Sequence, residues 1–93
     1  MVTLDQKVVS EQTVFAQEVD DEMVLLDMNS ENYFGLESVG AVMWQVIEEK
    51  KVLKDVLNEL LSYYDVEEER LKEDLLRFVE NLQKSGLIRV EEG

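Results

Sequence analysis

Short alternating runs of apolar and polar positions dominate the first half of the chain. Residues 13–19 alternate between two faces, which predicts a strand, and the acidic pair Asp20 and Asp21 predicts a turn after it. The next run, 22–28, has apolar residues on both faces, which suits a central strand covered by helices on one side. The expected faces of the first strand are Val14 and Ala16 on one side and Phe15, Gln17 and Val19 on the other.

A polar stretch and another short apolar run complete this region. Residues 29–32 have the composition of a turn, and residues 33–36 follow as a third short strand. Val8 and Val9 could add one more short strand nearer the start of the chain. The three main runs together predict an antiparallel meander.

Helical spacing replaces this alternation in the second half. Ser38 is placed to cap a first helix, a second helix is predicted over 52–64, and a third begins after Asp65. Asp65 and Glu68 have the spacing of a capping box, and Gly86 ends the third helix. The apolar positions are Val39, Val42, Met43, Val46 and Ile47 in the first helix, Leu53, Val56, Leu57, Leu60, Leu61 and Tyr64 in the second, and Leu71, Leu75, Phe78 and Leu82 in the third.

A last apolar run at 87–90 predicts a short closing strand. The expected fold class is therefore α+β. A three-stranded antiparallel sheet is followed by a three-helix, winged helix-turn-helix-like bundle and a short C-terminal strand. Residues 1–93 are expected to form one domain, because a chain of this length supports a single modest core.

The amino-acid composition excludes most kinds of catalytic site. The chain has no Cys, no His and no Pro. It therefore cannot build a thiolate or imidazole metal site, nor a Ser-His or Cys-His catalytic unit. Carboxylates are plentiful, but the sequence places no pair of them in a cleft for acid/base hydrolysis. We expect a protein that is not an enzyme and that uses no metal or cofactor.

Charge narrows the choice of partner. The chain has 22 acidic and 9 basic residues, a formal net charge of −13. A winged helix would ordinarily point to DNA, but an acidic third helix repels phosphates, so we expect no nucleic acid partner. Basic peptides or basic enzyme surfaces fit better, and the alternative is that the charge only maintains solubility. The acids of that helix are Glu67, Glu68, Glu69, Glu73, Asp74 and Glu80.

The chain also lacks the signals of membrane or secretory targeting. Its start has no basic segment followed by an apolar core, and its apolar runs are far shorter than the ~20 residues that span a bilayer. We therefore expect a cytoplasmic protein with no membrane partner.

Several segments occur in an order and spacing that resemble a known family. They are VLLD at 24–27, YFGL at 33–36, VGAVMW at 39–44, YDV at 64–66, the run from Asp74 to Leu82, and SGLI at 85–88. Together they resemble the PqqD family, whose members are recognition elements for ribosomally made, post-translationally modified peptides. The resemblance covers roughly residues 8–90. One departure is Lys50-Lys51, which stands where the family often has a Thr or Ser cap for the second helix.

The resemblance implies a function without catalysis, in which the leader of a precursor peptide is bound and its core is presented to another enzyme. In such proteins the leader adds as an antiparallel strand to the third strand and packs against the third helix. Carried onto this sequence, the strand residues are Asn32, Tyr33, Phe34, Gly35 and Leu36. The helix residues are Leu71, Asp74, Leu75, Phe78 and Val79.

The resemblance is greatest to the free-standing leader-binding proteins of lasso-peptide biosynthesis, which work with a separate leader peptidase. One alternative is a PqqD-type chaperone for a radical SAM enzyme that modifies peptides. Another is a structural or dimerisation winged-helix module without a peptide ligand. The expected oligomeric state is a monomer or a weak dimer.

Each candidate residue also has an ordinary structural interpretation. Tyr33 and Phe34 alternate, so one of them should pack in the core while the other is exposed or contacts ligand. Leu75 is expected to be mostly core, and Leu71 less so because it lies nearer the open end of the helix. Asp74 is either a solvated acid or a ligand contact.

Overall fold

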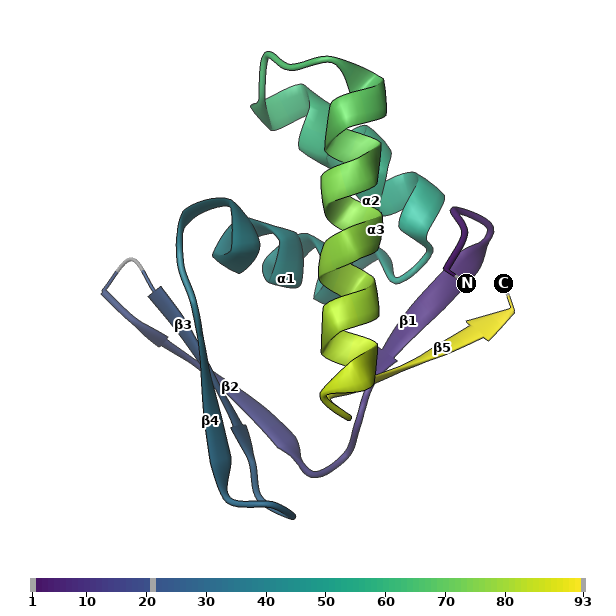
Figure 1. Cartoon of the computed structure of the whole chain (residues 1–93). Helices are drawn as coiled ribbons and strands as arrows, with labels where there is room; N and C mark the ends of the chain where they lie inside the picture. The colour runs from purple at the N-terminus through teal and green to yellow at the C-terminus, as the bar shows by residue number, and fades with distance from the viewer. Residues whose placement is uncertain (1, 21, 93) are drawn as a thin grey trace.

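The computed structural model describes residues 2–20 and 22–92, and these form five strands and three helices (Figure 1). The strands are β1 (Gln6–Ser10), β2 (Val14–Val19), β3 (Glu22–Asp27), β4 (Asn32–Leu36) and β5 (Ile88–Glu92). The helices are α1 (Ser38–Lys50), α2 (Leu53–Tyr63) and α3 (Glu68–Lys84). This order confirms the predicted α+β class, and the predicted third strand corresponds to β4.

The strands form two separate antiparallel sheets. The meander β2-β3-β4 makes one sheet, with β3 in the centre as the apolar pattern predicts. The second sheet joins the two ends of the chain, because β1 pairs with β5 through contacts such as Val8 with Val90. The closing strand was predicted from the sequence, but its partner was not.

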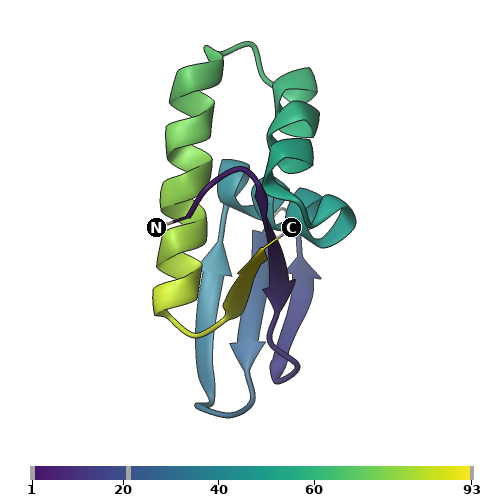
Figure 2. The ribbon, with the colours of Figure 1, turned by 90° about the vertical axis from the view of Figure 1, so that its right-hand side faces the viewer.

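The helices pack against both sheets: α1 contacts β1 and β3, α2 contacts β1, and α3 contacts β5. Figure 2 shows α2 and α3 running side by side and joined by a loop at one end, with β1 and β5 in front of the three-stranded sheet. The core includes Leu25 from β3, Ile47 from α1, Leu60 from α2 and Leu75 from α3, all of them almost fully buried. Trp44 is buried as well. No helix in the described part of the chain is long and apolar enough to cross a membrane.

The predicted helix caps are wrong. Glu37, not Ser38, is the N-cap of α1, and Glu67, not Asp65, is the N-cap of α3; neither forms a side-chain cap hydrogen bond. Ser38 instead has a φ of 50°. Its position at the sharp junction between β4 and α1 requires this left-handed backbone, whereas a capping residue needs an extended one. The chain enters α3 two residues later than the capping-box spacing implies.

The departure at Lys50-Lys51 marks the end of α1. Lys51 has a φ of 66°, and its N–H donates to the Ile47 carbonyl. Val52 then precedes α2 without a side-chain cap. The link is anchored by the first sheet strand instead, because the Val8 N–H donates to the Lys51 carbonyl at 2.9 Å.

Candidate functional site

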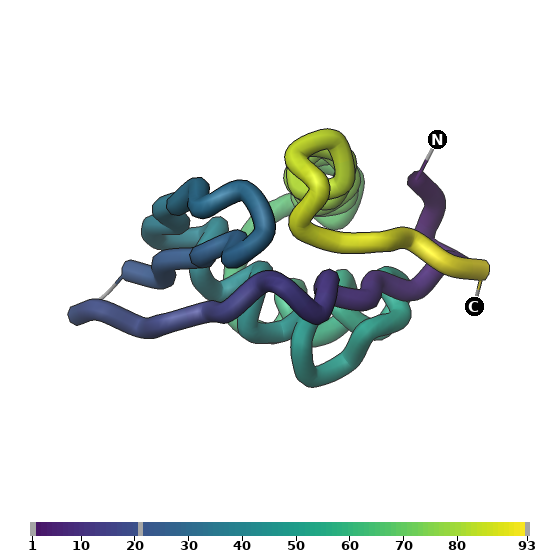
Figure 3. The backbone as a smooth tube through the Cα atoms, turned by 90° about the horizontal axis from the view of Figure 1, so that it is seen from below, coloured from purple at the N-terminus to yellow at the C-terminus, as the bar shows by residue number. Residues whose placement is uncertain are grey.

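Strand β4 lies at one edge of the three-stranded sheet. It pairs with β3 on one side, and the strand order β2-β3-β4 leaves its other side at the edge. Figures 1, 2 and 3 all show β4 running beside the C-terminal half of α3. An edge strand presents backbone N–H and C=O groups to which another extended chain can hydrogen-bond. The predicted strand and helix of the candidate site are therefore neighbours.

The side chains of β4 alternate between two environments. Phe34 lies opposite Leu25, and Leu36 opposite Met23, on the face of the sheet that packs on the core. Tyr33 lies opposite Leu26 on the other face and is 71% exposed. The expectation that one aromatic packs and the other is exposed is thus confirmed. The remaining two residues, Asn32 and Gly35, are both exposed.

A buried carboxylate holds the turn that leads into β4. Asp27 accepts hydrogen bonds from the Asn29 N–H at 3.0 Å, the Ser30 hydroxyl at 3.0 Å and the Thr13 hydroxyl at 3.2 Å. The Asn29 N–H, helped by both hydroxyls, holds the pKa of Asp27 below its ordinary value, although burial acts in the opposite direction. The charged form therefore stabilises the turn, and with it the position of the β4 edge.

This role of Asp27 was not predicted, although the sequence carries a signal for it. An Asp followed two residues later by a turn residue is typical of an Asx turn, in which the side chain accepts from the backbone. Glu31 completes the turn with a φ of 61°. This left-handed conformation is unfavourable for a residue with a Cβ.

The predicted residues of α3 fall into two groups. Leu71, Leu75 and Val79 are buried in the core, with exposed fractions of 4% or less. Asp74 is exposed and lies 3.9 Å from Arg77 on the same helix. The fifth residue, Phe78, is half-buried against the core cluster. Asp74 and Phe78 are thus the predicted α3 residues with surface available to a ligand.

Phe78 lies against the start of α1. A Cβ added to Gly40 would lie 3.6 Å from Phe78 Cε1, an ordinary van der Waals distance, so the Phe78 ring lies next to this turn of α1. Asp74 is four residues before Phe78 and therefore shares its side of α3. Because α1 follows β4 directly, this side of α3 faces the region where β4 ends.

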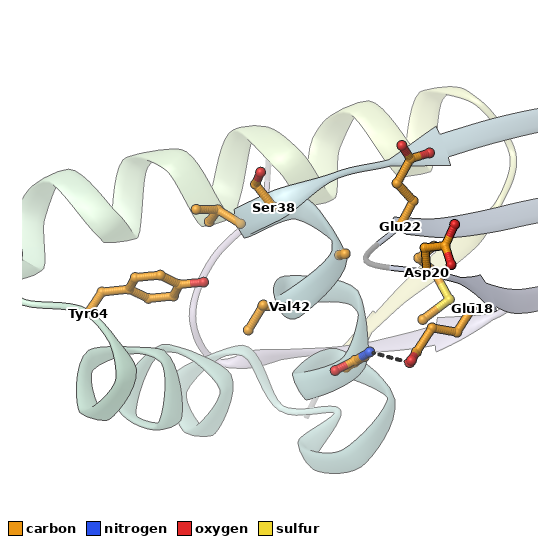
Figure 4. A pocket seen from close by; sticks show the side chains of 10 residues that line it. Glu18, Asp20, Glu22, Ser38, Val42 and Tyr64 are labelled. Carbon is orange, nitrogen blue, oxygen red and sulfur yellow. Dashed lines mark hydrogen bonds between the residues drawn. The ribbon is translucent and has the colours of Figure 1, made fainter.

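A separate pocket of about 410 Å³ lies between the β2–β3 hairpin and α1 (Figure 4). The carboxylates of Glu18, Asp20 and Glu22 line one side of it, while Val42 and Tyr64 contribute apolar surface. The Gln45 amide donates to Glu18 Oε2 at 3.2 Å. None of the site residues predicted from sequence lines this pocket. Neither in this pocket nor elsewhere in residues 2–20 and 22–92 do three acidic side chains gather in a way that could hold a metal ion.

An α+β chain whose winged-helix-like bundle lies beside an open sheet edge has the architecture of a peptide-recognition module. The family model described as "Coenzyme PQQ synthesis protein D (PqqD)" matches residues 22–88. The chain therefore belongs to the PqqD family, as the sequence resemblance predicts. The match runs from the first residue of β3 to the first residue of β5.

Two solved structures share this fold. TbiB1, solved in complex with the TbiA(beta) leader peptide, is 30% identical, with a TM-score of 0.83 over 87% of this chain and 94% of TbiB1. A lasso peptide synthetase B1, solved with its leader peptide, is 26% identical, with a TM-score of 0.81 over 89% of this chain and 98% of that protein. Comparison with curated proteins gave no match.

Proposed function

We propose that this chain is a non-catalytic adaptor that binds the leader of a ribosomally made precursor peptide and delivers it to a processing enzyme, with a lasso-peptide leader peptidase as the favoured partner. The observation that carries the proposal is the similarity, over nearly the full length of both chains, to two proteins solved with leader peptides. The open edge of β4 beside α3 supports the same function by geometry.

The proposed binding mode is strand addition. The leader runs antiparallel to Asn32–Leu36 and forms main-chain hydrogen bonds with it, which supply affinity with little dependence on sequence. Alternate leader side chains then point toward α3, where Phe34, Leu36 and Phe78 offer apolar contacts. Asp74 offers a carboxylate to a basic leader residue. The buried residues Leu71, Leu75 and Val79 hold α3 in place by packing in the core.

The test is a titration of isotope-labelled protein with leader peptides from candidate lasso precursors, followed by amide NMR. Strand addition predicts saturable shifts concentrated in residues 31–36 and 67–79. An affinity near 1 μM corresponds to about −8 kcal/mol and lies within the range of the titration. Saturable shifts located only elsewhere would overturn the binding mode, and no shifts with any leader would overturn the function.

Two variants sharpen this test, and the first changes an exposed side chain outside the core. Asp74→Asn should weaken binding of a leader with a basic residue, because it removes the charge but preserves the shape of the side chain. Asp55→Asn, an exposed acid on α2, is the matched control. Phe34→Ser should weaken binding of any leader, and its folding is checked by circular dichroism. Leu71→Asp is unsuitable because Leu71 is buried, and the charge would disrupt the fold.

The family description favours one second candidate. Because the matching family is that of coenzyme PQQ synthesis protein D, the partner could be a radical SAM enzyme that modifies a peptide. The same titration separates the two, since the cognate leader identifies the pathway. A dimeric winged-helix module is the third outcome, and it would be recognised by burial of the β4 edge between two copies.

A further inference from the structure

The three-stranded sheet has a second face, which points away from the helices. Pair register places Phe15, Leu26 and Tyr33 in one row across β2, β3 and β4 on this face. We call it the outer face, and its further apolar members are Val19, Val24 and Met28. Phe15 is 60% exposed and Tyr33 71% exposed. Apolar side chains are therefore gathered on one open surface.

The opposite face of the same sheet packs against the core. Met23 and Leu25, which alternate with the outer-face residues of β3, are buried in the core. Figures 1 and 3 show the helical bundle on that side of the sheet. The large exposed apolar residues of the described chain include Phe15, Val19, Met28 and Tyr33, all four on the outer face. A contiguous exposed apolar surface of this kind is typical of a protein-binding site.

The charge of the three-stranded sheet indicates which kind of protein could bind the outer face. No Lys or Arg occurs between Lys7 and Lys50, so the whole sheet carries acids without any base. Glu22 lies at one end of the outer face opposite Val19, and Glu31 lines a hollow of about 280 Å³ with Leu26, Met28 and Tyr33. A second copy of the chain would bring like charges together. A partner with an apolar centre and a basic rim is complementary.

The outer face is also continuous with the proposed leader-binding edge. Tyr33 belongs to both, because its backbone lies in β4 and its side chain lies on the outer face. A leader added beside β4 would place every second side chain on this face, next to Tyr33. Leader binding would therefore enlarge the surface and make a loaded adaptor different from an empty one.

We propose that the outer face docks the processing enzyme to which the leader is delivered, through an enzyme surface that is apolar at its centre and basic at its rim. This inference rests on the proposed function and adds the place and chemistry of the second contact. The adaptor then holds its leader at the β4 edge and its enzyme on the adjacent face. The precursor and the enzyme are brought together without competing for one site.

The experiment uses a candidate lasso-peptide leader peptidase and the leader peptide that binds this chain in the NMR titration. The two outer-face variants are Phe15→Ser and Val19→Ser, neither of which changes a residue of the proposed leader site. Their controls are Tyr63→Ser and Val66→Ser, which lie outside the sheet. Tyr63 is 55% exposed, close to the 60% of Phe15, and Val66 is 47% exposed, close to the 46% of Val19. Leader affinity and peptidase affinity are measured separately by calorimetry.

Phe15→Ser should raise the Kd for the peptidase by roughly tenfold, as expected for an aromatic residue near the centre of an interface. Val19→Ser should have a smaller effect, and leader affinity should remain within about twofold for both. Neither control should change either affinity. Raising NaCl from about 50 to 500 mM should weaken the peptidase complex, because ions screen the attraction between the two rims.

Other results would overturn the proposal. If an outer-face variant and its control lose the same peptidase affinity, the outer face is not part of the interface. The absence of any peptidase complex when the leader binds normally would also overturn the proposal, as would a dimer of the chain that Phe15→Ser dissociates. If the leader itself does not bind, the proposed function fails together with the docking site. The separate leader measurement distinguishes that case from the others.

Discussion

The two antiparallel sheets of this protein differ in almost every physical respect. The β1–β5 sheet joins the ends of the chain and buries Val8 and Ile88. It also carries bases among its acids, since Arg89 lies 2.9 Å from Glu11 and 3.8 Å from Glu91. The β2-β3-β4 sheet is built from local hairpins, has no base and keeps one face exposed. One sheet closes the core, and the other is left with surface available to partners.

The contrast indicates how a small acidic chain can combine stability with binding. Strand β1 is tied to the link between α1 and α2, because the Val8 N–H donates to the Lys51 carbonyl at 2.9 Å. The segment just before β1 is tied to α2, because the Lys54 N–H donates to the Leu4 carbonyl at 2.9 Å. This anchoring allows the other sheet to expose apolar side chains and an unpaired edge, which by themselves favour aggregation. The acidic charge of the open sheet opposes such association between identical copies.

The largest predicted effect compares a buried residue of the β1–β5 sheet with an exposed residue of the β2-β3-β4 sheet. Ile88→Ala should lower the free energy of unfolding by about 2–5 kcal/mol, because it leaves a cavity beside buried neighbours. Phe15→Ala, on the exposed face of the other sheet, should cost less than about 1 kcal/mol. Urea denaturation measures both. If Ile88→Ala is too unstable to study, Ile88→Val should still cost about 0.5–1.5 kcal/mol. A cost of Phe15→Ala above about 1 kcal/mol would contradict the comparison.

The next effect concerns the turn that positions β4. Asp27→Ala removes the acceptor of three hydrogen bonds and should lower Tm by roughly 5 °C at pH 7. Since folding lowers the pKa of Asp27 from 3.8, its charge contributes stability above that pH. The contribution is lost as the pH falls through the lower pKa of the folded state.

Thermal melts across pH 2–7 test this linkage. The difference in Tm between wild type and Asp27→Ala should be constant near neutrality and shrink below pH 4. A difference that is independent of pH would exclude the proposed charge dependence. Wild type and Asp27→Ala share all their other acids, so the effect of those acids cancels in the difference in Tm.

The smallest effect is a gain in stability within the open sheet. Glu31→Gly should raise the free energy of unfolding by up to about 1 kcal/mol, because glycine adopts the observed φ of 61° without a Cβ clash. Urea denaturation measures the gain. Leader affinity should be unchanged, because the substitution preserves the backbone of β4. A loss of stability would mean that the Glu31 side chain makes a favourable contact that outweighs the strain.

Prediction from sequence succeeded where one local pattern dominated. The apolar faces of residues 22–28 identified β3 as the central strand, and the leucine spacing in 71–82 identified α3. It failed at helix caps, because Ser38 and Asp65 have capping side chains but the chain path into each helix does not bring them to the N-cap position. Helix boundaries depend on the connecting backbone as well as on the residue type.

The candidate site was predicted to different degrees in its two parts. The exposed Tyr33 and the packed Phe34 follow from strand alternation, and the register confirms this. The residues of α3 were less well resolved, because one apolar stripe on a helix includes both core and boundary positions. Only packing distinguishes buried Leu75 from half-buried Phe78.

By itself, the sequence determined the order and type of the elements, the absence of Cys and His chemistry and the acidic charge, because each depends on residue type and local spacing alone. Tertiary structure decided that β1 pairs with β5, that β4 forms an edge beside α3, and that the outer face remains open. These features depend on contacts between segments far apart in the chain. Such contacts form only when the helices pack on one face of the meander, and no local pattern specifies which face that will be.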